Sequence, residues 1–307
     1  MRDRHQDKKT KHKGKRGGPH VGGRQAEGRK EKGAPWWRGV RDTRSKGNPE
    51  GGSERRDESG GTGTSPGDKV ILFGIHPIEA ALSNPKRVLG RLQLTDNAQR
   101  RLEAQIAARG AAVELVAPKD LDRRLGNETV HQGALLETQA LPEPSLEELA
   151  ETADQRPLVV LDQVTDPHNV GAILRSAAVF GAAGVVMTRR HSPPLDGTLA
   201  KSASGALEHV PITLVANLAR AIEELKELGF LVVGLDGEAE TDLTGIDWAQ
   251  RVALVLGAEG KGLRQLTRER CDQLCRIEAA GPIASLNVSN AAAVALHFAS
   301  FRRRAGK

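Results

Sequence analysis

The first segment with residue types suited to chemistry follows an apolar run, VVLDQV (159–164), and opens a helix that we expect over 169–180. Asn169 is placed to cap this helix, and Arg175 lies roughly 100° or more away from its apolar stripe. An amide and a guanidinium just beyond a strand can bind a polar substrate, because ligands of open α/β sheets bind outside the carboxyl ends of strands. Taken alone, the two residues are better explained as a helix cap and a surface ion pair.

The second segment, LVLGAEGKGL (254–263), places three glycines after a buried strand, which indicates a loop whose backbone lies close to another group. It is not an NTPase phosphate loop, because Leu263 follows where that loop needs Ser or Thr after Gly-Lys. Glu259 is the one acid of this loop. It either orients a substrate, pairs with Arg175, or faces solvent in a plain tight turn.

The third segment, IEAAGPIASLNVSN (277–290), runs from a strand through a Gly/Pro loop into the last helix. Ser285, Asn287 and Ser289 lie where side chains cap a helix, and for Ser289 we expect only that role. The loop also offers backbone groups suited to an adenine edge. Because all three segments follow strands of one predicted sheet, we expect their polar side chains to meet at one site.

The elements that position these segments form two α/β regions. Residues 68–145 predict a small domain with strands over 69–73 and 113–116, a turn over 74–77, helices from Ile78, over 97–109 and over 121–126, and a last strand from Gly133. The Pro/Glu-rich stretch 141–145 ends this domain, and we expect residues 146–156 to be a linker.

Residues 157–307 predict the second domain, in which apolar strands alternate with helices. Such runs are typical of a parallel sheet covered on both faces. We expect strands over 159–164, 184–187, 230–236 and 252–257, and helices over 169–180, 217–228 and 288–303.

The excess positive charge of the chain lies in its first 67 residues. The 307 residues carry 45 Lys and Arg against 39 Asp and Glu, and residues 1–67 hold 18 of the bases, 9 of the acids, and no Leu, Ile or Phe. The tail is therefore +9 and the remainder −3. We expect a disordered tail that adds RNA affinity through its cations, with base stacking by Trp36 and Trp37 as weaker support. A transit peptide is a minor alternative.

Composition excludes several other classes. There is no run of about 18 apolar residues for a membrane span, and the N-terminus lacks the apolar stretch of a secretory signal. The two cysteines, Cys271 and Cys275, suit neither a disulfide scaffold nor a zinc site, so we expect no metal and a reducing cytoplasm. No dinucleotide-binding fingerprint follows a strand in residues 68–307.

The segments NVGAILRSA (169–177), LVLGAEGKGL (254–263) and IASLNVSNAAAVAL (283–296) resemble the three motifs of the SpoU/TrmH family of RNA 2′-O-methyltransferases, in order and at family spacing. FGIHPIEAAL (73–82) and VHQGALLE (130–137) extend the resemblance to about residues 70–303. The match is closest to the bacterial enzymes that methylate a guanosine of 23S rRNA.

The resemblance implies the fold, the cofactor and the roles of the site residues. The second domain would be an α/β fold of the SPOUT class with a deep trefoil knot, preceded by an L30e-like RNA-binding domain. S-adenosylmethionine would be held around Gly257, Ile277 and Leu286. The chain would act on large-subunit rRNA as a homodimer that uses the helix over 288–303. Asn169, Arg175, Glu259, Ser285 and Asn287 match the family's catalytic or RNA-positioning residues.

Two alternatives stay open at this point. One keeps the chemistry and changes the substrate to tRNA. The other, from a different class, is a non-catalytic RNA-binding factor for ribosome assembly, although such a protein has no need for Asn169, Arg175 and Glu259 together. In the enzyme, we expect Arg175 to stabilise the developing alkoxide rather than to take its proton, because guanidinium stays protonated in proteins.

Overall fold

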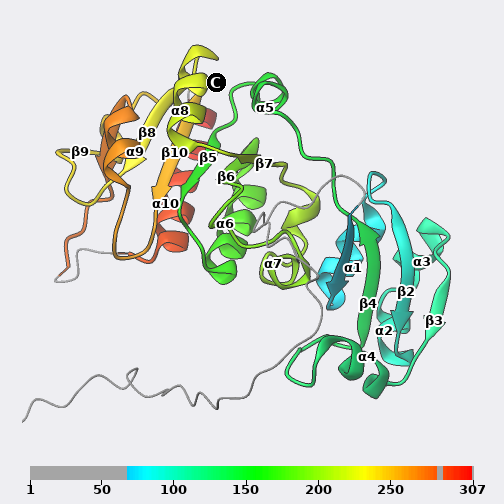
Figure 1. Cartoon of the computed structure of the whole chain (residues 1–307). Helices are drawn as coiled ribbons and strands as arrows, with labels where there is room; N and C mark the ends of the chain where they lie inside the picture. Colours follow the sequence, from blue (N-terminus) through cyan, green and yellow to red (C-terminus); the bar gives the residue numbers. More distant parts are fainter. Residues whose placement is uncertain (1–67, 282–285, 306–307) are drawn as a thin grey trace, which may run out of the picture. The chain divides into compact units, whose positions relative to one another are not determined.

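The computed structural model describes residues 68–281 and 286–305 (Figure 1). Residues 1–67, 282–285 and 306–307 lie outside the described part of the chain. The predictions made for the basic tail, for Trp36 and Trp37, and for Ser285 therefore fall on residues that the structure does not describe.

The first predicted domain, residues 68–145, contains a four-stranded sheet with helices packed on it. Its elements are β1 (Lys69–Phe73), α1 (Ile75–Ser83), β2 (Leu89–Leu94), α2 (Asp96–Arg101), α3 (Glu103–Arg109), β3 (Val113–Leu115), α4 (Pro118–Leu125) and β4 (Ala134–Gln139). The strand order is β1-β4-β2-β3, in which β4 is antiparallel to both neighbours and β2 is parallel to β3. The likeness to L30e stays a prediction.

The His131-Gln132-Gly133 turn links elements of this domain. Gln132 Oε1 accepts a hydrogen bond from the backbone N–H of Ile75 at 3.1 Å, at the start of α1. His131 Nδ1 accepts from the N–H of Gly133 at 3.0 Å, and its other ring nitrogen lies 3.0 Å from Asp122. Gly133 has φ +79° and no room for a Cβ against Thr95. Each residue of this motif thus has a structural role.

The second domain is built on a seven-stranded parallel sheet, as the apolar runs predict. Its elements are α5 (Leu146–Ala153), β5 (Leu158–Asp162), α6 (Pro167–Phe180), β6 (Gly184–Thr188), α7 (Gly197–Ser202), η1 (Ala206–Glu208), β7 (Ile212–Val215), α8 (Leu218–Glu227), β8 (Leu231–Leu235), β9 (Thr241–Asp242), η2 (Leu243–Gly245), β10 (Val252–Gly257), α9 (Gln265–Arg270), β11 (Gln273–Arg276) and α10 (Val288–Ala305).

Strand β10 lies between β5 and β8 in the order β7-β6-β5-β10-β8-β11-β9, so a late strand fills the centre of the sheet. This insertion brings the carboxyl ends of β5 and β10 side by side, with Gly257 paired to Asp162. The trefoil knot stays a prediction, because residues 282–285 between β11 and α10 lie outside the described part.

Helices cover both faces of this sheet (Figure 1). Alternate residues of each strand point to opposite faces, so Leu161 and Leu254 pack with α6 and α10, whereas Val160 and Val255 pack with α5 and α8. The strand side chains in both hydrophobic clusters are buried. The strands are therefore apolar on both faces and appear in the sequence as continuous apolar runs.

Several local predictions differ from the structure. The segment 146–156, predicted as a linker, contains α5, whose Leu146 and Leu149 are buried in the second cluster. The expected turn over 74–77 is the first turn of α1. The expected helix over 97–109 is two helices that meet at the buried Leu102.

No helix within 68–281 or 286–305 has the length and apolar character that a membrane-spanning helix requires.

Candidate functional site

Three polar side chains from distant segments meet at the carboxyl ends of β5 and β10. Asn169 Nδ2 donates to Glu259 Oε2 at 3.2 Å, and Asn287 Nδ2 donates to the same oxygen at 3.2 Å. Asn287 Nδ2 also lies 3.0 Å from Asn169 Oδ1. The predicted convergence of these three residues is therefore confirmed, and two amides orient one carboxylate.

Asn287 combines this contact with a structural role. Its Oδ1 accepts from the backbone N–H of Ser289 at 2.9 Å and from the Ser289 hydroxyl at 2.6 Å, in the first turn of α10. Because the oxygen is used by the helix, the amide nitrogen faces Asn169 and Glu259. The helix cap thus fixes the orientation of a site residue.

The prediction that Asn169 caps α6 is wrong. Asp166 is the N-cap, its carboxylate accepts from the N–H of His168 at 2.9 Å, and Pro167 occupies the first helical position. Proline is favoured there because its missing N–H needs no partner. Asn169 is therefore inside the first turn, and its side chain is free to reach Glu259.

Arg175 lies on α6, six residues after Asn169 and about 9 Å further along the helix axis. Its side chain is exposed. Within the described residues it makes no hydrogen bond or ion pair, so the pairing with Glu259, one of three alternatives open from the sequence, is not found. Glu259 instead faces the two amides.

The glycine-rich loop after β10 is a tight hairpin. Ala258 and Gly262 exchange backbone hydrogen bonds of 3.1 and 2.9 Å, and Gly260 and Gly262 have φ values of +75° and +65°. A Cβ on Gly257 would overlap the backbone of Gly262. These glycines allow the loop to fold back on itself with Glu259 near its tip.

Beside the three polar residues lies a cavity of about 380 Å³, within the range of small-molecule sites. Gly257, Ile277 and Leu286, the residues expected to hold a cofactor, all line it. Much of the remaining lining is apolar or small. Three acids, Asp236, Glu259 and Glu278, and one base, Arg276, supply its charged groups. Ser285 lies outside the described residues.

Comparisons with known proteins decide the family. A model described as the SpoU rRNA Methylase family matches residues 156–297, and one described as RNA 2'-O ribose methyltransferase substrate binding matches residues 71–144. The 23S rRNA (guanosine-2'-O-)-methyltransferase RlmB of Shewanella oneidensis is 40% identical over 241 residues, which cover 76% of this chain and 98% of that protein. The chain belongs to the SpoU methylase family.

Two further matches agree. RlmB of Pseudomonas putida is 42% identical over 241 residues, 76% of this chain and 96% of that protein. The SpoU methyltransferase AviRb of Streptomyces viridochromogenes, solved in complex with AdoMet, has a TM-score of 0.66 at 26% identity and covers 78% of this chain and 92% of its own. The predicted family, the RNA 2′-O-methyltransferase class and the SPOUT-type α/β architecture are confirmed.

One residue of this SpoU site carried no predicted role. Asp162, the last residue of β5, is fully buried, and both of its carboxylate oxygens bind Arg264. The available signal was an acid within the apolar run 159–164 that precedes the first motif. Its partner lies 102 positions away, which no local pattern indicates.

The two cysteines of this SpoU protein are not reactive groups. Burial raises the pKa of both the Cys271 and the Cys275 thiol to about 12, so neither forms the thiolate that nucleophilic chemistry needs.

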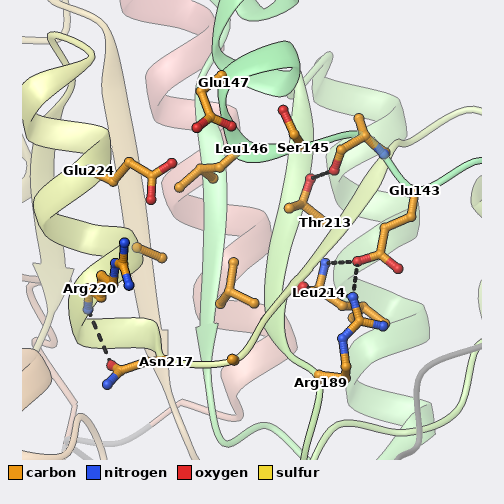
Figure 2. A pocket seen from close by; sticks show the side chains of 14 residues that line it. Glu143, Ser145, Leu146, Glu147, Arg189, Thr213, Leu214, Asn217, Arg220 and Glu224 are labelled. Atoms are coloured by element: carbon orange, nitrogen blue, oxygen red, sulfur yellow. Dashed lines mark hydrogen bonds and ion pairs between the residues drawn. The ribbon is translucent and has the colours of Figure 1, made fainter.

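A larger hollow, of about 560 Å³, lies at the edge strand β7 (Figure 2). There Glu143 Oε1 accepts from the N–H of Leu214 at 3.0 Å and from Arg189 at 2.6 Å, and Thr213 donates to the carbonyl of Pro144 at 3.0 Å. These bonds fasten residues 143–144 along the edge strand, which protects it from pairing with another chain. None of the predicted site residues lines this hollow.

Proposed function

We propose that this protein transfers a methyl group from S-adenosylmethionine to the ribose 2′-hydroxyl of a guanosine in 23S rRNA. The observation that carries the proposal is the convergence of Asn169, Glu259 and Asn287 beside the 380 Å³ cavity. The relatives named for that reaction match both domains, since the alignment covers 76% of this chain.

The cavity suits the proposed cofactor in size and in lining. A flexible nucleoside with an aliphatic tail needs apolar walls and close backbone approach, which Leu256, Gly257, Ile277 and Leu286 supply. When bound, S-adenosylmethionine supplies a methyl group that its sulfonium charge makes electrophilic. AviRb, whose fold this chain shares, was solved with that cofactor.

In this proposal the protein makes the 2′-oxygen nucleophilic by holding it and stabilising its charge. Arg175, exposed and without a partner among the described residues, is available to contact the ribose oxygen or an adjacent phosphate. A fixed cation near a developing alkoxide lowers the barrier most in a site that excludes water. The carboxylate of Glu259, held by two amides, orients the nucleotide, and Ser285 is proposed to assist.

Exposed apolar side chains on α6 and α10 support the proposed homodimer. Val179 and Phe301 are 74% and 60% exposed, and Val294 on α10 is 43% exposed. Several large apolar side chains exposed on two helices that pack together favour a protein–protein interface there. Val179→Glu is expected to convert a dimer to a monomer in sedimentation experiments, and a wild-type monomer at micromolar concentration would contradict the proposal.

We also propose that residues 68–145 bind the RNA substrate and that residues 157–307 carry the reaction, with α5 as part of the second unit. The cytoplasmic location stays a prediction.

The decisive experiment maps 2′-O-methyl nucleotides by mass spectrometry in rRNA and tRNA from cells with and without this protein. Loss of one methylated guanosine in 23S rRNA is the expected result. Loss of a tRNA methyl group instead would show that the substrate is tRNA. If neither RNA loses a methyl group and calorimetry detects no binding of S-adenosylmethionine, a non-catalytic RNA-binding protein is favoured.

A further inference from the structure

Asp162 is a buried carboxylate whose hydrogen bonds both go to Arg264, the residue that follows the glycine-rich loop. Its side chain is 0% exposed, Oδ1 lies 2.6 Å from Nε of Arg264, and Oδ2 accepts from the Arg264 backbone N–H at 2.9 Å. An ionised carboxylate is costly to bury unless it is paired in this way. Since both oxygens are occupied and shielded from solvent, Asp162 is not placed to take a proton from a substrate.

The backbone and the side chain of Asp162 lie at opposite ends of the loop that carries Glu259. At one end, Gly257 is the β-ladder partner of Asp162. At the other, Arg264 is the residue from which α9 begins. Between them, the Ala258–Gly262 hairpin leaves Glu259 few conformations.

The chain that follows Asp162 leads directly to the other half of the cluster. Helix α6 begins at Pro167, and Asn169 in its first turn donates to Glu259 at 3.2 Å. That bond and the one from Asn287 are already long, so a loop shift of a few tenths of an ångström would weaken both.

We propose that Asp162 and Arg264 form a positioning clamp that holds Glu259 within reach of Asn169 and Asn287. The clamp rests on the proposed methyl transfer and adds two residues to it. Both act through Glu259 and neither contacts the reacting atoms.

The test compares Arg264→Ala with Arg270→Ala in the full-length protein. Both arginines flank or belong to α9, both side chains are 47% exposed, and Arg270 pairs only with the exposed Glu223 among the described residues. At saturating S-adenosylmethionine and RNA, we expect the single-turnover rate to fall about 10- to 100-fold in Arg264→Ala and to change less than about twofold in Arg270→Ala. Arg264→Lys should be intermediate, because an ammonium restores the charge but not the Nε–H that donates to Oδ1 of Asp162.

A second comparison separates positioning from general destabilisation. In a Glu259→Gln background, Arg264→Ala should slow the reaction by less than about twofold further, because residues that act as one unit are not additive. Asp162→Asn should repeat this pattern. The same loss in both backgrounds, or a rate for Arg264→Ala equal to that of Arg270→Ala, would overturn the clamp.

Hydrogen exchange tests the clamp without any activity. The amides of Ala258 and Gly262 should exchange faster in Arg264→Ala than in Arg270→Ala; equal exchange would count against the clamp. An inactive wild-type protein would instead contradict the proposed function, so the two failures are distinguishable.

Discussion

Asn287 donates to Oδ1 of Asn169 at 3.0 Å across 118 positions of sequence. The same amide nitrogen lies 3.2 Å from Glu259, while the side-chain oxygen of Asn287 caps α10. One side chain therefore joins the start of the last helix to a polar cluster built on two other segments. A substitution of Asn287 can therefore remove the hydrogen-bond donor alone, or both the donor and the helix cap.

Asn287→Asp should abolish most methyl transfer and leave the fold intact. The carboxylate still caps α10, but it no longer donates and it repels Glu259. We expect the rate at pH 8 to fall at least about 100-fold. Lowering the pH should restore part of the activity, because repulsion between two adjacent carboxylates favours protonation of one of them. A rate profile from pH 5 to 8 checks this.

Asn287→Ala is the matched variant, because it removes both the donor and the cap. It should lose activity and also about 1 kcal/mol of unfolding free energy. Equal stability losses in the two variants would contradict the separation of roles.

Arg175→Lys should lose catalysis while cofactor binding survives. Arg175 is exposed, does not line the 380 Å³ cavity, and makes no hydrogen bond or ion pair within residues 68–281 and 286–305. Lysine keeps the charge but lacks the planar fork that contacts an oxygen at two points. We expect a rate loss of about 100-fold with the affinity for S-adenosylmethionine, measured by calorimetry, within about twofold. Retained turnover would refute the role of Arg175.

The sequence predicted the central sheet well, because its strands are buried on both faces and their apolar runs are unbroken. Strand β10 was predicted at its observed bounds, 252–257. Strand β2 was not predicted, because Arg91 and Gly90 interrupt its alternation and its inner half alone is buried. Helix α7, six residues long, has no periodic signal of its own and depends on packing against α6 and β1.

The sequence predicted that polar residues at the strand ends meet at one site, but it did not predict which side chains bond to one another there. Glu259 was a candidate partner for Arg175 by charge, yet it faces two amides. Asn169 was a candidate cap by type, yet Asp166 and Pro167 take that role. Opposite charges and capping residues are abundant in any sequence, and only the three-dimensional register selects among them.

Glu224 should make the protein less stable as the pH rises. Desolvation by burial, and then a hydrogen bond that the protonated carboxyl donates to the neighbouring Glu147 carboxylate, raise the pKa of Glu224. Both side chains are labelled in Figure 2. A raised pKa means that the folded state holds this proton more tightly than the unfolded chain does. Ionisation therefore favours unfolding, and stability falls between the usual carboxyl pKa and the raised one.

Glu224→Gln tests this sign. It should raise stability at pH 7 by about 0.5 kcal/mol, and the gain should disappear near pH 4, where Glu224 is protonated in both states. Melting temperatures of wild type and variant from pH 4 to 8 measure it. A gain that is constant across this range would show that ionisation is not the cause.

Glu208→Gln should destabilise the protein strongly. Glu208 forms a bidentate ion pair with Arg87, with Nε 3.1 Å from both carboxylate oxygens, and each side chain is only 2% exposed. Arg87 also donates to the carbonyl of Gln139 at 2.8 Å, so its guanidinium stays in place when the carboxylate is removed. An uncompensated buried cation costs about 3–5 kcal/mol of unfolding free energy.

Glu223→Gln is the control for this loss, because Glu223 is 45% exposed and pairs with the exposed Arg270. It should change the unfolding free energy by less than about 1 kcal/mol. The double variant Arg87→Met/Glu208→Leu should recover most of the loss, since apolar side chains of similar volume can replace a buried pair. Urea unfolding measures all three, and a cost for Glu208→Gln no larger than that for Glu223→Gln would show that burial adds nothing to this ion pair.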